Sequence, residues 1–396
     1  MLTVRICFVF LVVVSTWSIR AGSIKTVPIA IERLDSIDGM DDWDWTHART
    51  AYVGAGMEQW VTTMSQTTKR GSHGYHDIFE SVSSDRGKTW SSPSRISSLK
   101  RQTTKDGYDV APGDLWPSWH PATGTILVTG KSFNFAHMTG EDFLREKVLY
   151  AVKYLETSEW GPMRFVSMPV RDQAGYPLLA PNAGCNQPLV TSNGDLLLPV
   201  RYQRSREERI YTSIVARCRF DGETLSYVEH GSEHNLVRDR GLYEPSLTEY
   251  QGRYFLTLRA DHSAFVTSGS NGTHFEPIRE WRFDDGAVLG SYNTQQHWVT
   301  VGDGLFLVYT RKGANNDHIF RHRAPLFIAQ VDPERLVVIR KTERVLLEEN
   351  GACLGNSGIC KVSDQESWVT CREVRVSEGK RNGENNRVLF SRILAE

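Results

Sequence analysis

The sequence has no excess of charge of one sign, few cysteines and no segment with a long helical period of apolar residues. Acidic and basic residues nearly cancel, at 47 against 46, so the overall charge does not indicate a nucleic-acid partner. The spacing of Cys353 and Cys360 is a weak metal signal, and none of the 6 cysteines forms the two-pair pattern of a zinc site. We therefore expect no metal, no cofactor and buried structural thiols.

Long apolar runs are also absent beyond the N-terminus. There, Arg5 precedes the apolar run Ile6–Val14, and a small residue, Ala21, follows where a signal peptidase would cut. This pattern predicts a secretory signal over residues 1–22, which is too short to span a bilayer, and a mature chain over residues 23–396. We expect a secreted or periplasmic protein with no membrane insertion after cleavage. An uncleaved membrane anchor is the alternative.

Aromatic residues, glycine and short apolar strands are plentiful, with 11 Trp, 14 Tyr and 32 Gly, which is typical of an all-β chain with tight turns. Several segments share one pattern, in which an extended run and a turn with Gly, Asn or Asp precede a strongly apolar strand. Each predicts a β-hairpin. The six units are Arg49–Met64, Leu115–Thr129, Asn186–Val200, Glu244–Leu258, Asn293–Thr310 and Asn356–Thr370.

Repeats at this spacing indicate a propeller or a solenoid. Six units predict an all-β fold, a six-bladed β-propeller with four antiparallel strands per blade, over residues 23–396. We expect Lys25–Ile31 to lie beside Val388–Ile393 and complete the last blade, because this closure removes a free strand edge. Two separate β domains are the alternative, although no Pro/Ser-rich linker divides the chain.

The octapeptide Ser83–Trp90 (SSDRGKTW) predicts a tight turn, because its Asp and Ser/Thr side chains can bond to nearby amides and Gly87 permits the backbone. Its pattern, Ser-x-Asp-x-Gly-x-Thr-Trp, resembles the Asp-box of the sialidase superfamily. The resemblance implies a turn between the third and fourth strands of a blade, on the outer rim and away from the active site. Thr267–Phe275 is similar to a degraded second copy, in which Ser270 or Asn271 replaces the aspartate.

Basic residues recur near the ends of the predicted second strands. These strands end at the face where the first strands begin, so their basic residues should converge on one mouth of the central channel. The five residues are Lys131, Arg201, Arg259, Arg311 and Arg372. A ring of cations indicates an anionic ligand, and guanidinium binds carboxylate with two parallel hydrogen bonds, which favours a sugar acid. The alternative is that some form inter-blade salt bridges, Lys131 and Arg372 first.

The starts of the first strands supply acid–base and polar groups: His47, Arg49, Asp114, Asn186, Tyr243, Glu244, Tyr292, Asn293 and Asn356. The resemblance implies that Glu244 and Arg259 are the glutamate that opens one strand and the substrate-binding arginine that ends the next. We expect Arg49, Arg201, Arg311 and Asn293 to contribute to substrate binding as well.

A retaining sialidase needs a general acid/base and a tyrosine nucleophile assisted by a glutamate, because the substrate's own carboxylate repels a carboxylate nucleophile. Tyr243 or Tyr292, with Glu244, is the candidate pair. Asp114 is the candidate acid, with Asp109 and Asp77 as alternatives, and His47 belongs to the same acid–base set.

Two features depart from the family. Its Arg-Ile-Pro motif is absent from blade one, where His47-Ala48-Arg49 stands instead, and the last blade opens with Gly355-Asn356-Ser357 in place of the family's tyrosine. The resemblance implies a secreted, monomeric glycoside hydrolase of exo-α-sialidase type that acts on glycans with an acidic sugar.

A polysaccharide lyase acting beside a uronic acid is the first alternative, because such propellers use histidine and tyrosine for proton transfer. The chain carries these residues in predicted loops and inner strands: His47, His73, His76, His137, His262, His297, His318, Tyr202, Tyr243 and Tyr292. The polar segment Gly313–Pro325 (GANNDHIFRHRAP) predicts either a binding loop over the mouth or a salt-bridged corner. The second alternative is a non-catalytic carbohydrate-binding propeller that keeps the arginines.

Overall fold

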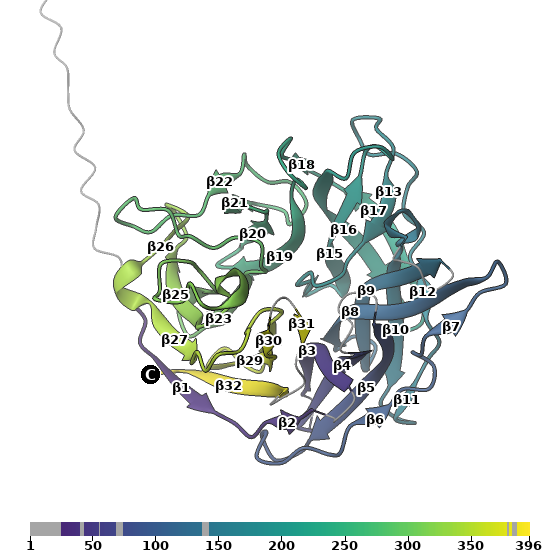
Figure 1. Cartoon of the computed structure of the whole chain (residues 1–396), viewed down its shortest axis with the longest axis horizontal. Helices are drawn as coiled ribbons and strands as arrows, with labels where there is room; N and C mark the ends of the chain where they lie inside the picture. The colour runs from purple at the N-terminus through teal and green to yellow at the C-terminus, as the bar shows by residue number, and fades with distance from the viewer. Residues whose placement is uncertain are drawn as a thin grey trace, which may run out of the picture.

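Six small antiparallel sheets surround a central axis in a computed structural model of the chain (Figure 1). The structure describes residues 25–39, 43–54, 56–68, 74–136, 142–377, 380–381 and 386–396. The predicted all-β, six-bladed propeller with four strands per blade is therefore confirmed. The predicted signal segment over residues 1–22, together with His73 and His137, lies outside the described residues.

The first three blades follow one another along the chain, each running from the axis outward. Blade 1 comprises β3 (Trp43–Val53), β4 (Gln59–Thr68), β5 (Tyr75–Ser83) and β6 (Ser94–Arg95). Blade 2 comprises β8 (Tyr108–His120), β9 (Thr125–Ala136), β10 (Val148–Tyr154) and β11 (Glu159–Trp160), with β7 (Gln102–Thr103) and β12 (Arg164–Phe165) at its edges. Blade 3 comprises β13 (Leu179–Asn182) and β14 (Leu189–Val190), then β15 (Asp195–Gln203), β16 (Tyr211–Phe220), β17 (Leu225–His230) and β18 (His234–Asn235).

The remaining blades complete the ring. Blade 4 comprises β19 (Tyr243–Tyr250), β20 (Arg253–Arg259), β21 (Ala264–Gly269) and β22 (Arg279–Glu280). Blade 5 comprises β23 (His297–Val301), β24 (Gly304–Tyr309), β25 (Leu326–Asp332), β26 (Val337–Val338) and β27 (Arg344–Leu347). Blade 6 comprises β28 (Gly358–Lys361), β29 (Glu366–Glu373), β32 (Arg387–Ala395), β1 (Ile29–Arg33) and β2 (Ile37–Asp38). Three short 3₁₀ helices, η2 (Phe143–Arg145), η3 (Phe320–His322) and η4 (Arg340–Thr342), and the hairpin of β30 (Val376–Ser377) and β31 (Lys380–Arg381) lie in connections.

The two ends of the described chain close the ring together. Strand β1 pairs antiparallel with β32, with Ile29 opposite Ala395 and Ile31 opposite Ile393. This is the predicted closure, although the strand begins at Ile29 rather than Lys25. Because the pairing satisfies the outer edge of β32, blade 6 presents no long unpaired strand there.

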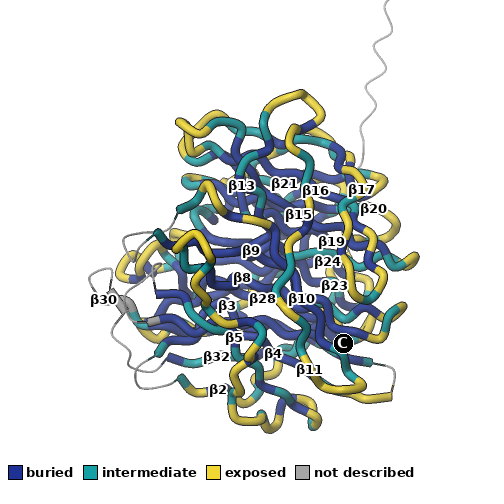
Figure 2. Tube along the Cα trace, turned by 90° about the vertical axis from the view of Figure 1, so that its right-hand side faces the viewer, coloured by how far each residue is buried: buried dark blue, intermediate teal, exposed yellow. Residues whose placement is uncertain are grey.

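Buried tryptophans pack the blades against one another, and most residues of the inner strands are buried (Figure 2). Trp60 of blade 1 stacks on Trp368 of blade 6 at 4.9 Å between ring centroids, and Trp281 lies 5.6 Å from Trp298 of blade 5. All four side chains are nearly inaccessible to solvent. Such close packing makes the ring a rigid frame for side chains at the channel ends.

The octapeptide Ser83–Trp90 joins β5 to β6, the third and fourth strands of blade 1. The Asp85 carboxylate accepts hydrogen bonds from the Thr89 amide at 2.9 Å and the Thr89 hydroxyl at 2.7 Å. Gly87 has a φ of 73°, and a Cβ there would lie 2.8 Å from the Trp368 ring. Trp90 stacks on Phe390 at 4.3 Å. These contacts make the segment a structural turn at the outer part of the blade, as predicted.

Equivalent turns in three other blades contain a similar side-chain acceptor. Asn271 accepts from the His274 amide at 2.8 Å between β21 and β22, so the predicted second copy occupies the matching place. Asp221 accepts from the Thr224 amide at 2.6 Å between β16 and β17, and Asp332 accepts from the Glu334 amide at 2.9 Å between β25 and β26. An oxygen on the side chain thus fixes the outer turn whether it belongs to a carboxylate or an amide.

Candidate functional site

One residue with left-handed backbone stands within or shortly before the innermost strand in every blade. The six residues are His47, Asp114, Cys185, Glu244, Asn293 and Asn356, and their φ angles lie between 48° and 68°. These residues surround one end of the central channel, and we call this end the mouth. Register shifts mark the same point in β3, β8 and β19. Left-handed non-glycine residues are uncommon and gather at functional sites, where a bulge re-aims a side chain.

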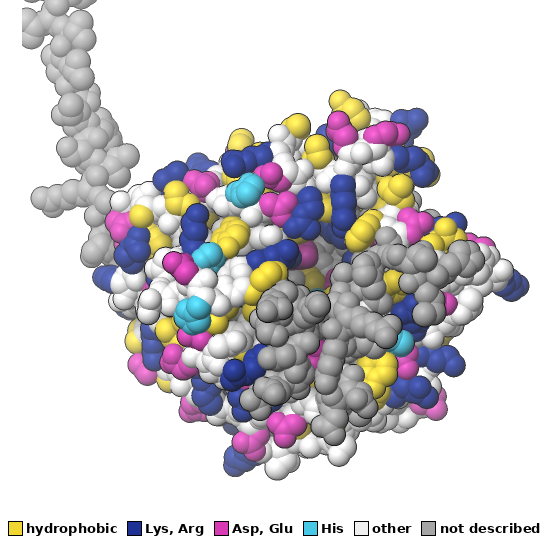
Figure 3. All heavy atoms as spheres, viewed as in Figure 1, with side chains coloured by type: hydrophobic (Ala, Val, Ile, Leu, Met, Phe, Trp, Pro, Cys, Tyr) yellow, Lys and Arg dark blue, Asp and Glu magenta, His cyan; other side chains and the backbone are white. Residues whose placement is uncertain are grey.

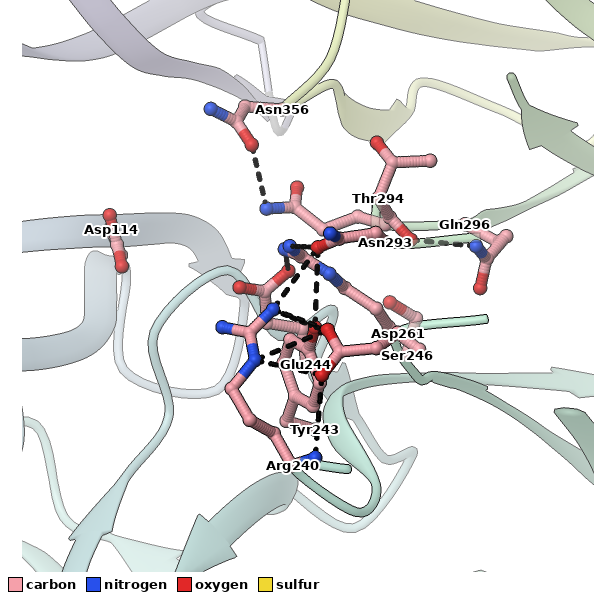
Figure 4. Close-up of polar contacts among 12 residues, drawn as sticks. Asp114, Arg240, Tyr243, Glu244, Ser246, Asp261, Asn293, Thr294, Gln296 and Asn356 are labelled. Carbon is pink, nitrogen blue, oxygen red and sulfur yellow. Dashed lines mark hydrogen bonds and ion pairs between the residues drawn. The ribbon is translucent and has the colours of Figure 1, made fainter. Parts of the chain in front are cut away.

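Four of these residues surround one opening in Figure 4, where Asp114 stands across from Glu244, Asn293 and Asn356. Lys and Arg side chains gather near the middle of the same face, over β15 and β19 (Figure 3). The predicted convergence of the first-strand residues is therefore visible in the structure. Cys185 takes the blade 3 position, one residue before the expected Asn186.

Asp114 and His47 form a close pair at the mouth. His47 Nδ1 lies 2.5 Å from Asp114 Oδ1, and Lys131 Nζ lies 4.0 Å from Asp114 Oδ2. Burial lowers the pKa of His47, although Asp114 opposes this shift, and Arg49 adds to it. Burial alone would raise the pKa of Asp114, but His47, Lys131 and Arg49 hold it below its ordinary value. At neutral pH the pair is a carboxylate beside a neutral imidazole.

Asp77 and Asp109, the alternative acids, lie away from this pair. Asp77 accepts a hydrogen bond from the Arg101 amide at 2.9 Å, and Asp109 accepts from the Arg101 guanidinium at 3.1 Å. Asp109 also accepts from the Thr103 hydroxyl at 2.8 Å. These contacts leave Asp114 as the one of the three aspartates that belongs to the ring.

A buried glutamate that the sequence did not single out joins two of the predicted cations. Glu146 is fully buried, and its carboxylate lies 2.8 Å from Lys131 Nζ and 3.1 Å from Arg201 Nη2. Asn182 also donates to it. Glu146 and Lys131 belong to blade 2, so their salt bridge lies within one blade, whereas the contact of Glu146 with Arg201 of blade 3 is an inter-blade salt bridge. Arg201 reaches the mouth region with its charge already paired.

Glu244 and Arg259 face each other across the start of β19 and the end of β20. Arg259 Nη1 donates to the Glu244 carboxylate, and its Nη2 donates to Asn293 Oδ1 at 2.6 Å. Burial would raise the pKa of Glu244, but Arg259 holds it below its ordinary value. The structure therefore brings together the glutamate and arginine that the resemblance paired.

Positive charge accumulates around Arg323, on the connection between β24 and β25. Arg323 is buried, and its Nη2 donates to the Asn293 carbonyl at 2.7 Å. Burial, followed by the charges of Arg259, Arg321 and Arg372, lowers the pKa of Arg323 to about 9. Burial and neighbouring positive charges both disfavour the charged form of a guanidinium group. The guanidinium groups of these four arginines thus concentrate positive charge at one side of the mouth.

Asn316 holds the connection that carries Arg323. Its Nδ2 donates to the carbonyls of Arg311 at 2.9 Å and Ala324 at 2.6 Å, and the side chain is buried. Arg321, two residues before Arg323, is exposed and forms no ion pair within the part of the chain that the structure describes. The segment Gly313–Pro325 is thus both a fixed corner at its start and a charged edge of the mouth at its end.

Neither predicted tyrosine places its hydroxyl on Glu244. The Tyr243 hydroxyl donates to Asp261 Oδ1 at 2.6 Å and accepts from Arg240 Nη2 at 2.6 Å. Burial raises the pKa of Tyr243 to about 12. Its ring lies between two guanidinium groups, with the Cζ atoms of Arg240 and Arg259 both 4.7 Å from the ring centroid.

Tyr292 belongs to a separate chain of hydrogen bonds beside the mouth. Its hydroxyl lies 2.6 Å from His322 Nδ1, and His322 Nε2 lies 3.1 Å from Asp317 Oδ1. Burial raises the pKa of Tyr292, whereas Arg321 and Arg323 oppose that shift. Tyr292 thus contacts a histidine, His322, rather than the expected glutamate, Glu244.

Two further predicted substrate-binding arginines make hydrogen bonds within the protein. Arg49 is fully buried in the channel, where it donates to the Leu115 carbonyl at 3.3 Å and Gln295 Oε1 at 3.2 Å. Arg311 follows the end of β24, and Glu343 accepts from its Nε at 2.8 Å and its Nη2 at 2.6 Å. This bidentate pair neutralises the charge of Arg311, and its binding of a substrate carboxylate stays a prediction.

At least three side chains that could bind a metal ion approach one another at a single place among the described residues. The ligand atoms of His47, Asp114 and Cys185 lie within 4.8 Å of one another, and all three residues are buried. Lys131 and Arg49 add positive charge beside them, which opposes a cation. Burial also raises the pKa of the Cys185 thiol far above its usual range. This set therefore fits a proton-holding group better than a metal centre.

The opposite end of the channel opens into a cavity of about 960 Å³, lined by the last residues of the innermost strands. Its charged groups are exposed at the rim, where Lys361 pairs with Asp364 at 2.8 Å. The buried acid–base groups described above all lie at the mouth. The mouth, rather than this cavity, is therefore the candidate active site.

The fold is a six-bladed propeller whose mouth carries a cluster of charged groups, and solved structures share its architecture. No protein family model and no curated protein matches the chain. The chain is similar to a protein of unknown function from Dyadobacter fermentans, with 14% identity and a TM-score of 0.62, over 92% of this chain and 99% of that one. It is also similar to a Trypanosoma rangeli sialidase, with 14% identity and a TM-score of 0.62, over 91% of this chain and 59% of that one.

An α-L-arabinofuranosidase from Fusarium graminearum is a third similar structure, with 12% identity and a TM-score of 0.60, over 91% of this chain and 97% of that one. The chain thus spans somewhat less than two thirds of the trypanosomal sialidase and nearly the whole of the other two. At these identities the similarity shows the fold. Within the described residues, no helix is both long enough and apolar enough to span a membrane.

Proposed function

We propose that the protein is a secreted glycoside hydrolase that acts on glycans containing an acidic sugar. The observation that supports this most directly is that buried Arg323 stands among Arg259, Arg321 and Arg372, and burial, followed by these three charges, lowers its pKa to about 9. A bound carboxylate relieves that repulsion. Each charged hydrogen bond contributes about 1.5–3 kcal/mol, so two or three are enough to orient a sugar acid.

The His47–Asp114 pair is the proposed proton donor. In the free protein Asp114 is ionised, because His47 and neighbouring cations stabilise its charge. An anionic substrate adds negative charge to the mouth, which raises the pKa values of nearby groups and favours a proton on the pair. Glu244, ionised and facing Asp114 across the mouth, is the second carboxylate, as glycoside hydrolysis commonly requires.

Sialosides are the first substrates to test. The Glu244–Arg259 contact corresponds to the pair that the sialidase resemblance implies, and solved sialidases share the fold. The contacts of Tyr243 and Tyr292 favour a mechanism without a tyrosine–glutamate nucleophile, since neither hydroxyl bonds to Glu244 in the described structure.

The test is incubation of the purified protein with sialosides and with uronate polysaccharides, reading both new reducing ends and ultraviolet absorbance of an unsaturated product. We expect new reducing ends without that absorbance, and their loss in Glu244→Gln and Asp114→Asn. Lack of turnover of every acidic glycan in the panel contradicts the proposal.

A polysaccharide lyase is the second candidate, and the Tyr292–His322 hydrogen bond of 2.6 Å favours it. A histidine that holds a tyrosine hydroxyl beside the mouth suits removal of a C5 proton. New reducing ends that carry ultraviolet absorbance, lost in Tyr292→Phe but retained in Glu244→Gln, identify this reaction.

A further inference from the structure

A groove runs over blades 2 and 3 at the same end of the propeller as the mouth. Its cavity has a volume of about 730 Å³, which lies in the range of small-ligand sites. Its walls include the side chains of Tyr108, Ser132, Leu144, Lys147, Phe165 and Val170. The start of β8, the end of β9, residues 142–147 before β10, β12 and the segment before β13 contribute these residues, and all of these segments lie toward the mouth.

The groove and the mouth share a wall. Glu146 lines the groove, and its carboxylate contacts Lys131 at 2.8 Å and Arg201 at 3.1 Å. Lys131 in turn lies 4.0 Å from Asp114, the proposed proton donor. A chain that leaves the mouth on this side passes over one salt-bridged layer and enters the groove.

Apolar side chains gather in the groove although it faces solvent. Leu144, Phe165 and Val170 are 38%, 41% and 82% exposed, and they are three of the nine large apolar side chains that are exposed in the described chain. Exposed apolar surface gathered in one concave place marks a binding site rather than a stable surface. The flat ring of Phe165 suits the C–H face of a sugar ring.

The groove also carries a cation suited to an acidic ligand. Lys147 Nζ lies 5.3 Å from the centroid of the Phe165 ring and forms no ion pair within the described residues. By contrast, Arg145 is paired with Asp106 at 2.7 Å. An aromatic platform beside an unpaired ammonium group fits a sugar that carries a carboxylate.

We propose that the groove binds further sugar units of an acidic oligosaccharide or polysaccharide whose cleaved linkage lies at the mouth. The proposal deepens the proposed function and rests on it for the position of the linkage. It assigns the protein to chains of acidic sugars rather than to a single terminal sugar on an unrelated carrier.

The test compares chain lengths in the double variant Lys147→Gln/Phe165→Ala. Both side chains are exposed, so the fold should tolerate their replacement. The probes are disaccharides and hexasaccharides of α2,8-linked sialic acid and of galacturonic acid. For the hexasaccharide that the wild type cleaves, we expect kcat/KM to fall at least tenfold, with the disaccharide unchanged. Equal effects at both lengths, or no effect on the hexasaccharide, overturn the proposal.

A matched control replaces exposed side chains outside the groove, Lys341→Gln and Val228→Ala, and should leave both substrates unchanged. Calorimetric titration separates failure of the groove from failure of the proposed function. If the wild type cleaves none of the probes, the hydrolase proposal fails, and the groove is judged by binding alone. Tighter binding of hexasaccharide than disaccharide, lost in the double variant, supports the groove, and binding without length dependence overturns it.

Discussion

Arg323 shows at the scale of one residue how a binding site conflicts with stability. Its pKa is lowered to about 9 by burial and by three neighbouring guanidinium groups, so the free protein contains repulsion that an anionic ligand relieves. We expect Arg323→Gln to reduce kcat/KM for an acidic substrate by ten- to a hundredfold, about 1.4–2.8 kcal/mol, while the melting temperature stays equal or rises. Substrate kinetics and thermal unfolding on the same preparations check both halves.

The control for this residue is Arg311→Gln, which breaks the bidentate contact with Glu343. That change should lower the melting temperature, and an unchanged KM for the acidic substrate would contradict the prediction that Arg311 binds a substrate carboxylate. A fall in melting temperature of several degrees in Arg323→Gln, with unchanged kinetics, would mean that Arg323 is structural.

The His47–Asp114 pair makes a second prediction at this scale. Because burial lowers the pKa of His47 to about 4, the pair gains no further proton at neutral pH in the free protein and gains one only as the pH approaches about 4. We therefore expect kcat/KM to rise from pH 7 toward acidic pH. His47→Asn should weaken that rise, and a profile of kcat/KM that is flat between pH 4 and 7 contradicts the assignment.

At the scale of single elements, the turn from β5 to β6 depends on one acceptor side chain. Asp85 accepts from both the amide and the hydroxyl of Thr89, and Asn271 serves in the matching turn of blade 4. We expect Asp85→Ala to lower the melting temperature by a few degrees and Asp85→Asn to restore most of it, with the kinetic constants of the folded protein unchanged. A large loss of turnover at unchanged melting temperature would show that the turn contributes to the reaction.

The strands were predictable because each hairpin has its own turn signal and apolar strand, and the same pattern recurs in all six blades. The site was predictable only in part. Glu244 and Arg259 stand at strand ends, where the repeat fixes their position. Arg311 lies two residues past the end of β24, and side-chain direction there depends on local turning rather than on strand alternation. Arg323 reaches the mouth from an irregular connection, whose path no periodic pattern specifies.

At the scale of the whole molecule, buried neutral histidines make the fold sensitive to acid. Burial lowers the pKa of His234 to about 4 and places the pKa of His297 well below its ordinary value. The unfolded chain binds protons at these residues near pH 6.5, whereas the folded protein does not bind one at His234 until about pH 4. The unfolding free energy is therefore highest above pH 6.5 and is progressively lost as the pH falls from 6.5 to about 4.

For His234 alone the loss is about 3 kcal/mol, from 1.36 kcal/mol per pKa unit. Carboxylates with lowered pKa values lose their contribution only as the pH falls below about 4, so histidines dominate this window. Denaturant unfolding at a series of pH values should show the decline, and His234→Asn should make it shallower without changing it above pH 7. If the variant and the wild type show the same pH dependence, His234 is protonated in the folded protein and the buried-histidine explanation is wrong. In that case, protonation of His234 would not lower the unfolding free energy over the acidic pH range proposed for catalysis.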